Sequence, residues 1–576
     1  MAIELKGCKE NQVTIVEMIL DQSPDGESWH CLGNPCDFVC EQISYWFTDC
    51  KTLPSHLPAP TEGQYIIESL THNPTTLEYG ETFSTRGTIK LCMHDMPDCN
   101  GKGYWLSKFI ASQKYFKNRI VNVYTGTCDQ SLECFQKDTY LIDYVTRFPS
   151  ADCIHCFTLK DPLSITEDAE CPNKPAELQS LKIPFKLVSM STGGDSEENP
   201  FEFIGSLLFT EGITDQELIE CIVSQKLICI GEELLEVEPI LTNTGWNLRL
   251  IDRGACGTDI EEHSEGDSIV FSERFERVHV ADLVRYLIKE CVDIESIFKV
   301  CCEGTDNNIV DWSTFEQFKC ENPYAYTCDT YICKPVKISD LLKELAQVFL
   351  FSLFFDSTTG TIKMLSVKPP NCGEPEVETI TQCMLTRDNF NVSRTKDSYN
   401  RVVVLHTLAN CTGDPTRNNL TNFKASINTD SVNEICDQRE QKGFNTLTLM
   451  SRFINECNSY VARTAADRWL ALTPCDGVQL RVSVLKEVAD CFSMGDYLKL
   501  EHDKIRDKDG EFDTGLWYLK GKATGSSGCV DITIERLPFQ RQFAHCLSVC
   551  CGPPECCDVI AVPTGDCDDL ECMGLW

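Results

Sequence analysis

The sequence lacks the features that mark most exported and membrane-bound chains. Its first ten residues, MAIELKGCKE, contain no apolar core of a signal peptide, so we expect no export by such a signal. The longest apolar run, LAQVFLFSLFF at 345–355, is too short to span a bilayer. The composition also shows no collagen-like, low-complexity or coiled-coil bias, which leaves an ordinary globular protein.

Motifs of the common enzyme classes are absent as well. There is no phosphate-binding loop, no dinucleotide-binding glycine motif after a strand, no HExxH and no GxSxG. The segment DKDGEFD at 507–513 begins like a calcium loop but lacks the rest of the twelve-residue pattern, so it predicts a hairpin turn. The sequence therefore gives no positive indication of an enzyme.

Basic residues are scarce relative to acidic ones. Lys and Arg number 51 against 88 Asp and Glu, which gives a net charge of −37. A surface of this sign repels nucleic acid rather than binding it. Two interpretations stay open, namely simple solubility and a surface to which passing DNA must not adhere.

Cysteine, in contrast, is abundant, with 36 residues in 576. Extracellular proteins use cysteines as disulfides, whereas cytosolic proteins use them for metals or catalysis. A cysteine-rich chain without a signal peptide is typical of neither compartment. A virion component, which is assembled in the host bacterial cytoplasm and then works outside a cell, reconciles the two observations.

Four of these cysteines form the strongest candidate site, and they are Cys31, Cys36, Cys40 and Cys50. Gly33 and Pro35 shape a tight loop between the first two. Four thiolates can hold zinc or an iron–sulfur cluster, and two local disulfides are the alternative. The spacing alone does not decide between them.

A second cysteine motif is CIHC at Cys153–Cys156. Redox-active CxxC pairs open helices, where the helix dipole lowers the thiol pKa, whereas this motif lies in a strand-like run. Side chains alternate along a strand, so the two cysteines point to opposite faces. We expect each to be buried or to form a disulfide elsewhere.

The stretch RGACGTDIEEHSEGD at 253–267 mixes a cysteine, a histidine and several carboxylates, and it could belong to a hydrolase or a metal site. Its glycines lie where predicted strands turn, which is a backbone requirement. His263 could act as a base, but no nucleophile with a partner accompanies it. We therefore expect this stretch to be structural.

The periodicity of apolar residues predicts a mainly β protein with α+β parts. Strand–helix–strand order occurs near 89–160, where we expect a helix at 101–116 and then three strands at 119–126, 139–148 and 152–162. The same order returns near 400–536, with a helix expected at 451–472, which suggests two related β-barrel domains. Between them lie a small β-module and a helix with Ser339 as its N-cap, followed by a hairpin that turns at Gly360.

Six segments follow from this pattern. They are a cysteine-containing N-terminal segment (1–60), a first barrel (61–160), an inserted β-module (161–275), an α/β domain (276–370), a second barrel (371–545) and a cysteine-rich tail (546–576).

An ordered set of segments resembles the hub proteins of long-tailed bacteriophage tail tips, in the group around chi-like phages and related transposable Pseudomonas phages. The set comprises HCLGNPC with Cys50 downstream, STRGTIKLCMHDMP, YFKNRIVNVYTG, KDPLSITEDAECP, IGEELLEV with DRGACGTDIEEHSEGD, VHVADLVRYLI, NRVVVL and SRFINE. The resemblance covers most of the chain. The C-terminal cysteine cluster departs from it, so the role of that tail stays open.

The resemblance implies a structural protein of the virion, with a fold like that of contractile-phage hubs. Such hubs are homotrimers whose two barrels per subunit form a ring that meets the hexameric tail tube. The expected partners are the distal tail protein, the tail-tip and central fibre proteins and the tape-measure protein, and DNA passes through the lumen without specific binding. Some tail-tip proteins carry an iron–sulfur cluster, which favours metal at the four cysteines.

Two other functions remain as alternatives to the hub. A tail-associated cell-envelope hydrolase would need a catalytic pair or a metal triad. A host-binding adhesin would fit exposed loops held by many disulfides.

Overall fold

The computed structural model describes most of the chain, and all structural statements below concern these residues. They are 12–21, 42–50, 53–61, 66–70, 75–77, 89–97, 103–113, 115–146, 148–150, 152–171, 187–192, 205–209, 227–242, 245–255, 258–263, 269–298, 309–322, 326–356, 359–367, 378–385, 391–394, 399–410, 413–429, 432, 444–472, 478–506, 510–511, 515–524 and 529–536. No helix among them is long and apolar enough to cross a membrane.

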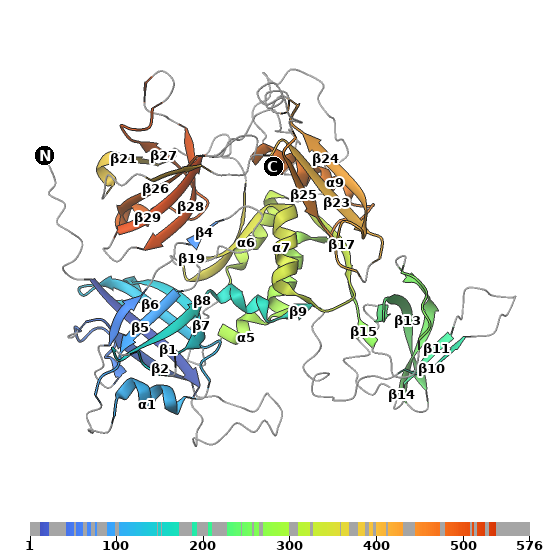
Figure 1. The fold of residues 1–576 in the computed structure, drawn as a ribbon, viewed down its shortest axis with the longest axis horizontal. Coiled ribbons are helices and arrows are strands. Elements are labelled where there is room, and N and C mark those ends of the chain that lie inside the picture. The colour runs from blue at the N-terminus through green and yellow to red at the C-terminus, as the bar shows by residue number, and fades with distance from the viewer. Residues whose placement is uncertain are drawn as a thin grey trace.

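The first sheet is antiparallel and has seven strands in the order β2-β1-β6-β7-β8-β5-β3. The strands are β1 (Gln12–Asp21), β2 (Gln42–Thr48), β3 (Ile67–Leu70), β5 (Ile89–His94), β6 (Ile120–Thr127), β7 (Gln136–Val145) and β8 (Ile154–Lys160). Helix α1 (Trp105–Ser112) packs its Trp105 and Phe109 rings against Phe47 of β2 (Figure 1). The predicted helix and the three strands that follow it are confirmed. The strands β1 and β2 lie within 1–60, yet they belong to this sheet.

A separate six-stranded sheet follows, in the order β10-β11-β14-β13-β12-β15. Its strands are β10 (Leu187–Thr192), β11 (Gly205–Phe209), β12 (Leu227–Ile230), β13 (Glu233–Thr242), β14 (Gly245–Asp252) and β15 (Ile269–Phe271). We call it the inserted sheet, because the chain enters it from the first sheet and leaves it into the central helices. The expected strands on both sides of the 253–267 stretch are present.

The centre of the molecule combines helices and short sheets around the most extensive hydrophobic core. The elements are η4 (Pro162–Glu167), β9 (Glu170–Cys171), β16 (Glu273–His279), α4 (Val280–Tyr286), the π-helix η6 (Leu287–Cys291), α5 (Ile294–Phe298), α6 (Trp312–Glu321), β17 (Thr327–Ile332), β18 (Val336–Lys337), α7 (Ile338–Phe349), β19 (Phe351–Asp356) and β20 (Thr361–Ser366). The β19–β20 hairpin turns at Gly360, whose φ of +69° favours glycine, so that prediction is confirmed.

The predicted N-cap of α7 is wrong. The helix begins at Ile338 with Lys337 as its N-cap, so Ser339 lies inside the first turn. The reason is that the N–H of Ile338 donates to the carbonyl oxygen of Ala169 beside the short β18–β9 pair. A neighbouring backbone carbonyl thus satisfies the first N–H group of the helix, which allows the helix to begin at Ile338.

A three-stranded sheet in the order β24-β23-β25 extends this centre. It consists of β23 (Arg401–Leu408), β24 (Leu420–Ile427) and β25 (Thr446–Met450), and α9 (Ser459–Leu472) packs on one face. The predicted helix over 451–472 begins eight residues too early, since α9 starts at Ser459. Asn458 accepts the N–H of Asn455 and donates its amide to the carbonyl oxygen of Thr327, which holds the preceding turn outside the helix.

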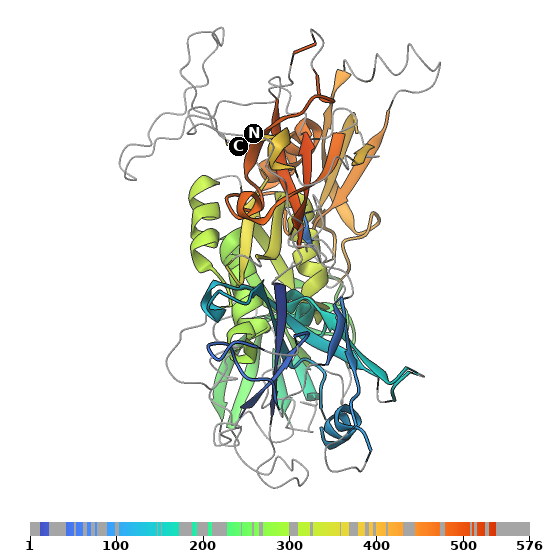
Figure 2. The same ribbon diagram turned by 90° about the vertical axis from the view of Figure 1, so that its left-hand side faces the viewer.

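The last sheet contains β21 (Thr379–Thr381), β22 (Asn391–Arg394), β26 (Val478–Leu485), β27 (Tyr497–Glu501), β28 (Leu516–Thr524) and β29 (Cys529–Arg536), with the short α10 (Lys486–Ala489) beside it. The two-residue strand β4 (Thr75–Thr76) leaves the N-terminal region and pairs with β28. Figure 2 shows the last sheet above the first sheet, and Figure 1 shows the central helices to one side of these two sheets.

The mainly β character is confirmed, but the closed barrels are wrong for the described residues. The first sheet ends at β2 and β3 and the last at β21 and β22, and no pairing joins these end strands where the chain is described. The segment 371–545 also divides into two sheets, because α9 packs on β23 and β24 instead of on the last sheet. Alternating side chains predict strands, whereas closure depends on the tilt and stagger of the strands.

Candidate functional site

The four-cysteine site can be placed only in part. Cys31, Cys36 and Cys40 lie outside the described residues, so the metal site stays a prediction. Cys50 follows β2 and lies within hydrogen-bond distance of Cys128 at the end of β6. Burial, reinforced by the Cys50 thiol, raises the pKa of Cys128. Cys128 is therefore an additional thiol at this position.

The two cysteines of the CIHC motif lie in different environments, but only Cys156 lies in the expected strand, since β8 begins at Ile154. Cys156 of β8 forms a disulfide with Cys92, directly opposite on β5, with 4.1 Å between the Cα atoms. Cys153 lies just before the strand with a positive φ of 58° and forms no disulfide. The motif is thus no redox pair.

The described parts of this stretch, residues 253–255 and 258–263, lie around Glu233, a fully buried residue at the start of β13. The Glu233 carboxylate accepts two hydrogen bonds from the Arg253 guanidinium, at 2.8 and 2.6 Å, and one each from the N–H groups of Gly254 and Glu261. His263 Nε2 lies 2.7 Å from the same carboxylate.

These contacts decide what the stretch can do. Burial by itself opposes ionisation, but the hydrogen bonds from Arg253, Glu261 and His263 outweigh it and lower the pKa of Glu233. A carboxylate held ionised by this many donors fixes a loop and is a poor proton acceptor. His263 is 2% exposed at its side chain, so it is poorly placed to meet a substrate. The geometry supports a structural role.

A Ser–His–Asp cluster occurs elsewhere, beside α1. Ser107 Oγ donates to Asp95 Oδ2 at 2.5 Å and lies 3.1 Å from His155 Nε2, while the same nitrogen lies 3.3 Å from Asp95. A catalytic triad uses the two imidazole nitrogens for different partners, one for serine and one for aspartate. Here Nδ1 instead faces the carbonyl oxygen of Thr146, at 3.0 Å.

The role of Asp95 explains this arrangement. Its carboxylate also accepts the N–H groups of Leu106, at 2.7 Å, and Ser107, at 3.0 Å, in the first turn of α1. The His155 side chain is fully buried and that of Asp95 nearly so. The cluster is therefore a helix cap tied to β8.

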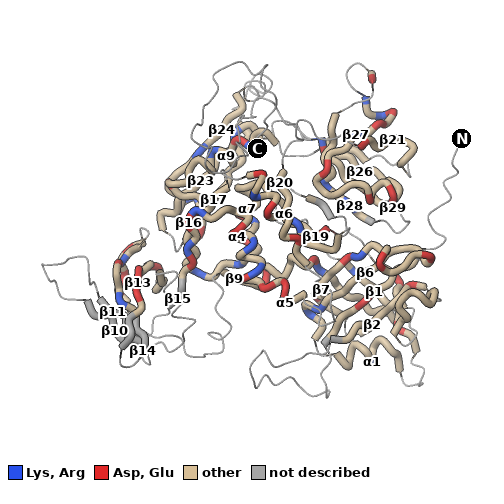
Figure 3. Tube along the Cα trace, turned by 180° about the vertical axis from the view of Figure 1, so that it is seen from behind, with Lys and Arg blue, Asp and Glu red and all other residues tan. Residues whose placement is uncertain are grey.

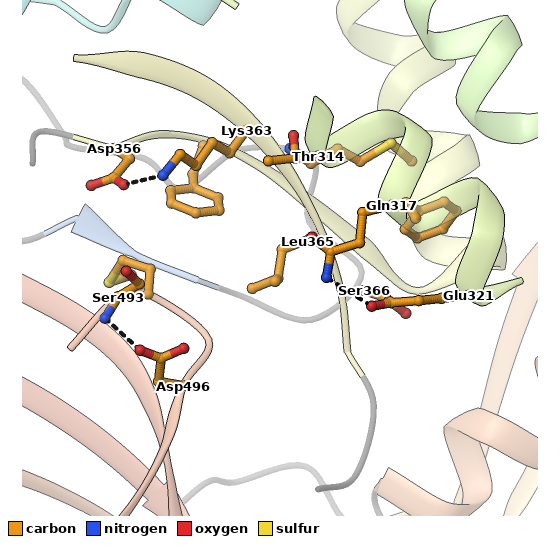
Figure 4. Close-up of a pocket in the computed structure, with 13 residues that line it drawn as sticks. Thr314, Gln317, Glu321, Asp356, Lys363, Leu365, Ser366, Ser493 and Asp496 are labelled. Atoms are coloured by element: carbon orange, nitrogen blue, oxygen red, sulfur yellow. Dashed lines mark hydrogen bonds and ion pairs between the residues drawn. The ribbon is translucent and has the colours of Figure 1, made fainter. Parts of the chain in front are cut away.

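A cavity of about 210 Å³ lies between α6, β20 and the turn before β27. Figure 4 shows the Asp356–Lys363 pair on one side and Ser493 with Asp496 on the other. Lys363 donates to Asp356 at 2.7 Å, and the N–H of Ser493 donates to Asp496 at 2.6 Å. The described lining contains no histidine or cysteine, so it lacks a base paired with a nucleophile.

The three-stranded sheet β24-β23-β25 has an outer face, opposite to α9, that is open in the described structure. Three rows of cross-strand neighbours make up this face, and they are Phe423–Leu405–Met450, Ala425–Val403–Thr448 and Ile427–Arg401–Thr446. The alternate residues Val402 and Val404 are buried on the α9 side. Strand β23 therefore carries apolar residues on both faces.

The large apolar side chains of the outer face are more exposed to solvent than is usual for apolar residues of this size. Phe423 is 65% exposed, Ile427 44% and Met450 40%. Phe444, just before β25, is 45% exposed and lies under the Arg401 guanidinium at 4.6 Å. Contiguous apolar surface of this kind marks binding surfaces in soluble proteins.

The outer face also differs from the rest of the protein in charge. Figure 3 shows Asp and Glu distributed over the described sheets and helices, with Lys and Arg interspersed. The nine residues of the outer face include one arginine and no carboxylate, although the chain has 88 Asp and Glu. This face therefore carries none of the negative charge that dominates the molecule.

No protein-family model matches the chain, and no curated protein matches it. Among solved structures, a prophage MuSo2 43 kDa tail protein from Shewanella oneidensis is similar with a TM-score of 0.34 and 8% identity, over 82% of this chain and 97% of that one. A prophage tail protein from Listeria monocytogenes has a TM-score of 0.29 and 8% identity, over 82% and 88%. A gene transfer agent virion chain has 0.28 and 11%, over 69% and 81%. These TM-scores are low, so the proposals below rest on the residues of this chain.

Proposed function

We propose that the chain is a structural protein of a bacteriophage tail tip, a hub that joins the tail tube to the tip and surrounds the DNA exit path. The observation that carries this proposal is the apolar, carboxylate-free outer face of the β24-β23-β25 sheet. The ordered segments that resemble tail-tip hubs support it independently. A mainly β chain with several sheets is also suited to ring assembly.

The occupant that we propose for the outer face is a second copy of this chain, within a homotrimer. Copies with a net charge of −37 repel each other, and a contact costs least where carboxylates are absent. Large exposed apolar side chains, such as Phe423, Ile427 and Met450 of the outer face, are typical anchors of such interfaces. Closed rotational symmetry also covers the free edges of β24 and β25.

The hydrolase alternative receives less support from the described residues. The Ser107–His155–Asp95 cluster is a buried helix cap, and the Glu233 site is a satisfied ionic network. The adhesin alternative predicts a monomer or a surface of disulfide-bonded loops. The trimer therefore separates the hub from both alternatives.

The remaining partners follow from the hub proposal. A ring at the tail tip contacts the distal tail protein above it, the tip and central fibre proteins below it and the tape-measure protein in its lumen. Its place is the virion, after assembly in the host cytoplasm.

The test is the mass of the purified full-length chain by light scattering. We expect the mass of three copies of the 65.0 kDa chain. Phe423→Asp places a charge in the proposed interface, and we expect it to weaken assembly about 30-fold or more, since a large aromatic anchor contributes roughly 2 kcal/mol or more. The far-ultraviolet circular dichroism of the variant should stay unchanged.

Ile260→Asp is the matched control, because Ile260 is 66% exposed, as Phe423 is 65%, but lies beside the inserted sheet. This variant should remain a trimer. A wild-type monomer at micromolar concentration and in isolated virion tails, or a trimer that Phe423→Asp leaves intact, would contradict the proposal.

A further inference from the structure

Three metal-binding side chains come together where the short strand β9 meets the β16–α4–η6 segment, about a hundred residues later in the sequence. Cys171 of β9, Glu273 at the start of β16 and Cys291 at the end of η6 place their ligand atoms within 4.8 Å of one another. Cys171 is fully buried and Cys291 is 6% exposed. Tyr286, the last residue of α4, hydrogen-bonds to the Glu273 carboxylate.

The spacing and the ligand types suit a tetrahedral metal ion. Zn–S bonds of about 2.3 Å and Zn–O bonds of about 2.1 Å place neighbouring ligand atoms about 3.5–3.8 Å apart. The observed separations need little closure to reach this geometry. Two thiolates and a carboxylate form a mixed soft and hard set that zinc accepts, with a fourth position left for water.

Two observations favour a metal over a plain disulfide. The Cys171 and Cys291 thiols lie within hydrogen-bond distance of each other, so a disulfide would account for the two sulfurs alone. It would leave the partly buried Glu273 carboxylate beside them, which in the described part of the chain is hydrogen-bonded to the neutral Tyr286 hydroxyl. A metal ion accounts for the thiols, the carboxylate and also Tyr286, which orients the carboxylate as outer-shell residues do.

We propose that Cys171, Cys291 and Glu273 bind one divalent transition-metal ion, with Zn²⁺ as the expected ion. The site is separate from the four N-terminal cysteines and does not depend on the hub function. Cys171 precedes the inserted sheet and Glu273 follows β15 directly, so the ion ties the entry and the exit of this sheet to the end of η6. Closing so long a loop at its base limits the motion of the inserted sheet.

The experiment counts metal in the full chain with Cys31, Cys36 and Cys40 replaced by Ser, so that the N-terminal cysteines do not contribute. The protein is purified without oxygen, and zinc and iron are measured by mass spectrometry. We expect one equivalent per chain. Cys171→Ser and Cys291→Ser should lose it, and Tyr286→Phe should weaken zinc affinity about 10–100-fold, as outer-shell changes do.

Cys328→Ser is the matched control, because Cys328 is a fully buried cysteine of the same core that lies outside the cluster, and it should keep the metal. If a cysteine variant fails to fold, the test is the zinc affinity of Tyr286→Phe relative to that of the unsubstituted site, measured by competition for zinc. Chelation should also speed amide exchange in β9 and β16 but not in β26–β29. A folded chain without metal, or peptides linked by a Cys171–Cys291 disulfide in anaerobic protein, would overturn the proposal.

Discussion

At the scale of single residues, the inserted sheet depends on one carboxylate. Glu233 neutralises Arg253 and fixes the two backbone N–H groups and the histidine of the following loop. The donors Arg253 and His263 lie in the unusual stretch 253–267, which the sequence makes easy to notice. The acceptor Glu233 lies twenty residues before Arg253, in a strand whose sequence has no unusual feature. Local sequence patterns cannot predict a contact between positions this far apart.

Replacement of Glu233 should therefore cost far more than replacement of His263. We expect Glu233→Gln to destabilise the inserted sheet by about 3–5 kcal/mol, because Arg253 keeps a buried charge without its partner. His263→Ala should cost about 1 kcal/mol and leave any enzymatic activity of the virion unchanged. Amide exchange in β13 and β14 measures both.

The ranking of the two variants is the decisive result. Equal costs would mean that the network is not centred on Glu233. Loss of a measurable activity in His263→Ala, with assembly intact, would show that the stretch is catalytic after all.

At the scale of elements, helix α4 begins on a histidine. His279 Nδ1 accepts the N–H of Ala281 at 3.1 Å, and Nε2 donates to the carbonyl oxygen of Asn322 at 2.9 Å. The cap requires a neutral ring, because a protonated Nδ1 cannot accept. Burial lowers the pKa of His279 below its ordinary value of 6.5, although the Asn322 hydrogen bond opposes this.

This cap predicts a pH dependence of stability. In the unfolded chain the histidine binds a proton below about pH 6.5, whereas the folded chain resists protonation until a lower pH. The contribution of the His279 cap to the stability of the folded chain is thus complete above pH 6.5. It declines as the pH falls from there toward the pKa of His279 in the folded chain. His279→Asn keeps a capping oxygen but does not titrate.

Amide exchange in α4 between pH 7.5 and 5.5, corrected for intrinsic rates, measures this effect. We expect the opening free energy of the wild type to decline more than that of His279→Asn. Parallel declines would show that other groups account for the acid sensitivity.

Most elements were predictable, since alternation and helical periodicity depend on local sequence alone. The start of α9 and the cap of α7 were not, because Asn458 and Ala169 act through distant backbone groups. One feature of the sequence could have predicted the exposed apolar outer face of the β24-β23-β25 sheet. The run VVVL at 402–405 is apolar without alternation, which indicates a strand covered on both faces, and among the described residues α9 covers only one face.

At the scale of the whole molecule, the net charge of −37 bears on the DNA path. If the trimer surrounds the exit path, its inner wall should carry an excess of Asp and Glu. Each Lys or Arg that contacts a phosphate adds salt-sensitive affinity and would slow passage. A structure of the tail tip would show the sign of the charge on the inner wall. In a second measurement, the purified ring should not bind duplex DNA even at low salt.

A basic inner wall, or tight binding of DNA that weakens with added salt, would contradict this prediction. An inner wall of mixed charge without DNA binding would attribute the acidic composition to solubility alone.

The pairing of β4 with β28 also has a consequence for synthesis of the chain on the ribosome. Thr76 is translated 445 residues before its partner Gly521 (521 − 76), which at about 5–20 residues per second is a wait of roughly 20–90 s. During that time β4, which follows the first-sheet strand β3 in the sequence, is present without its partner β28. The pair can form only on chains translated nearly to the end, so truncated products lack this closure between the two ends of the molecule.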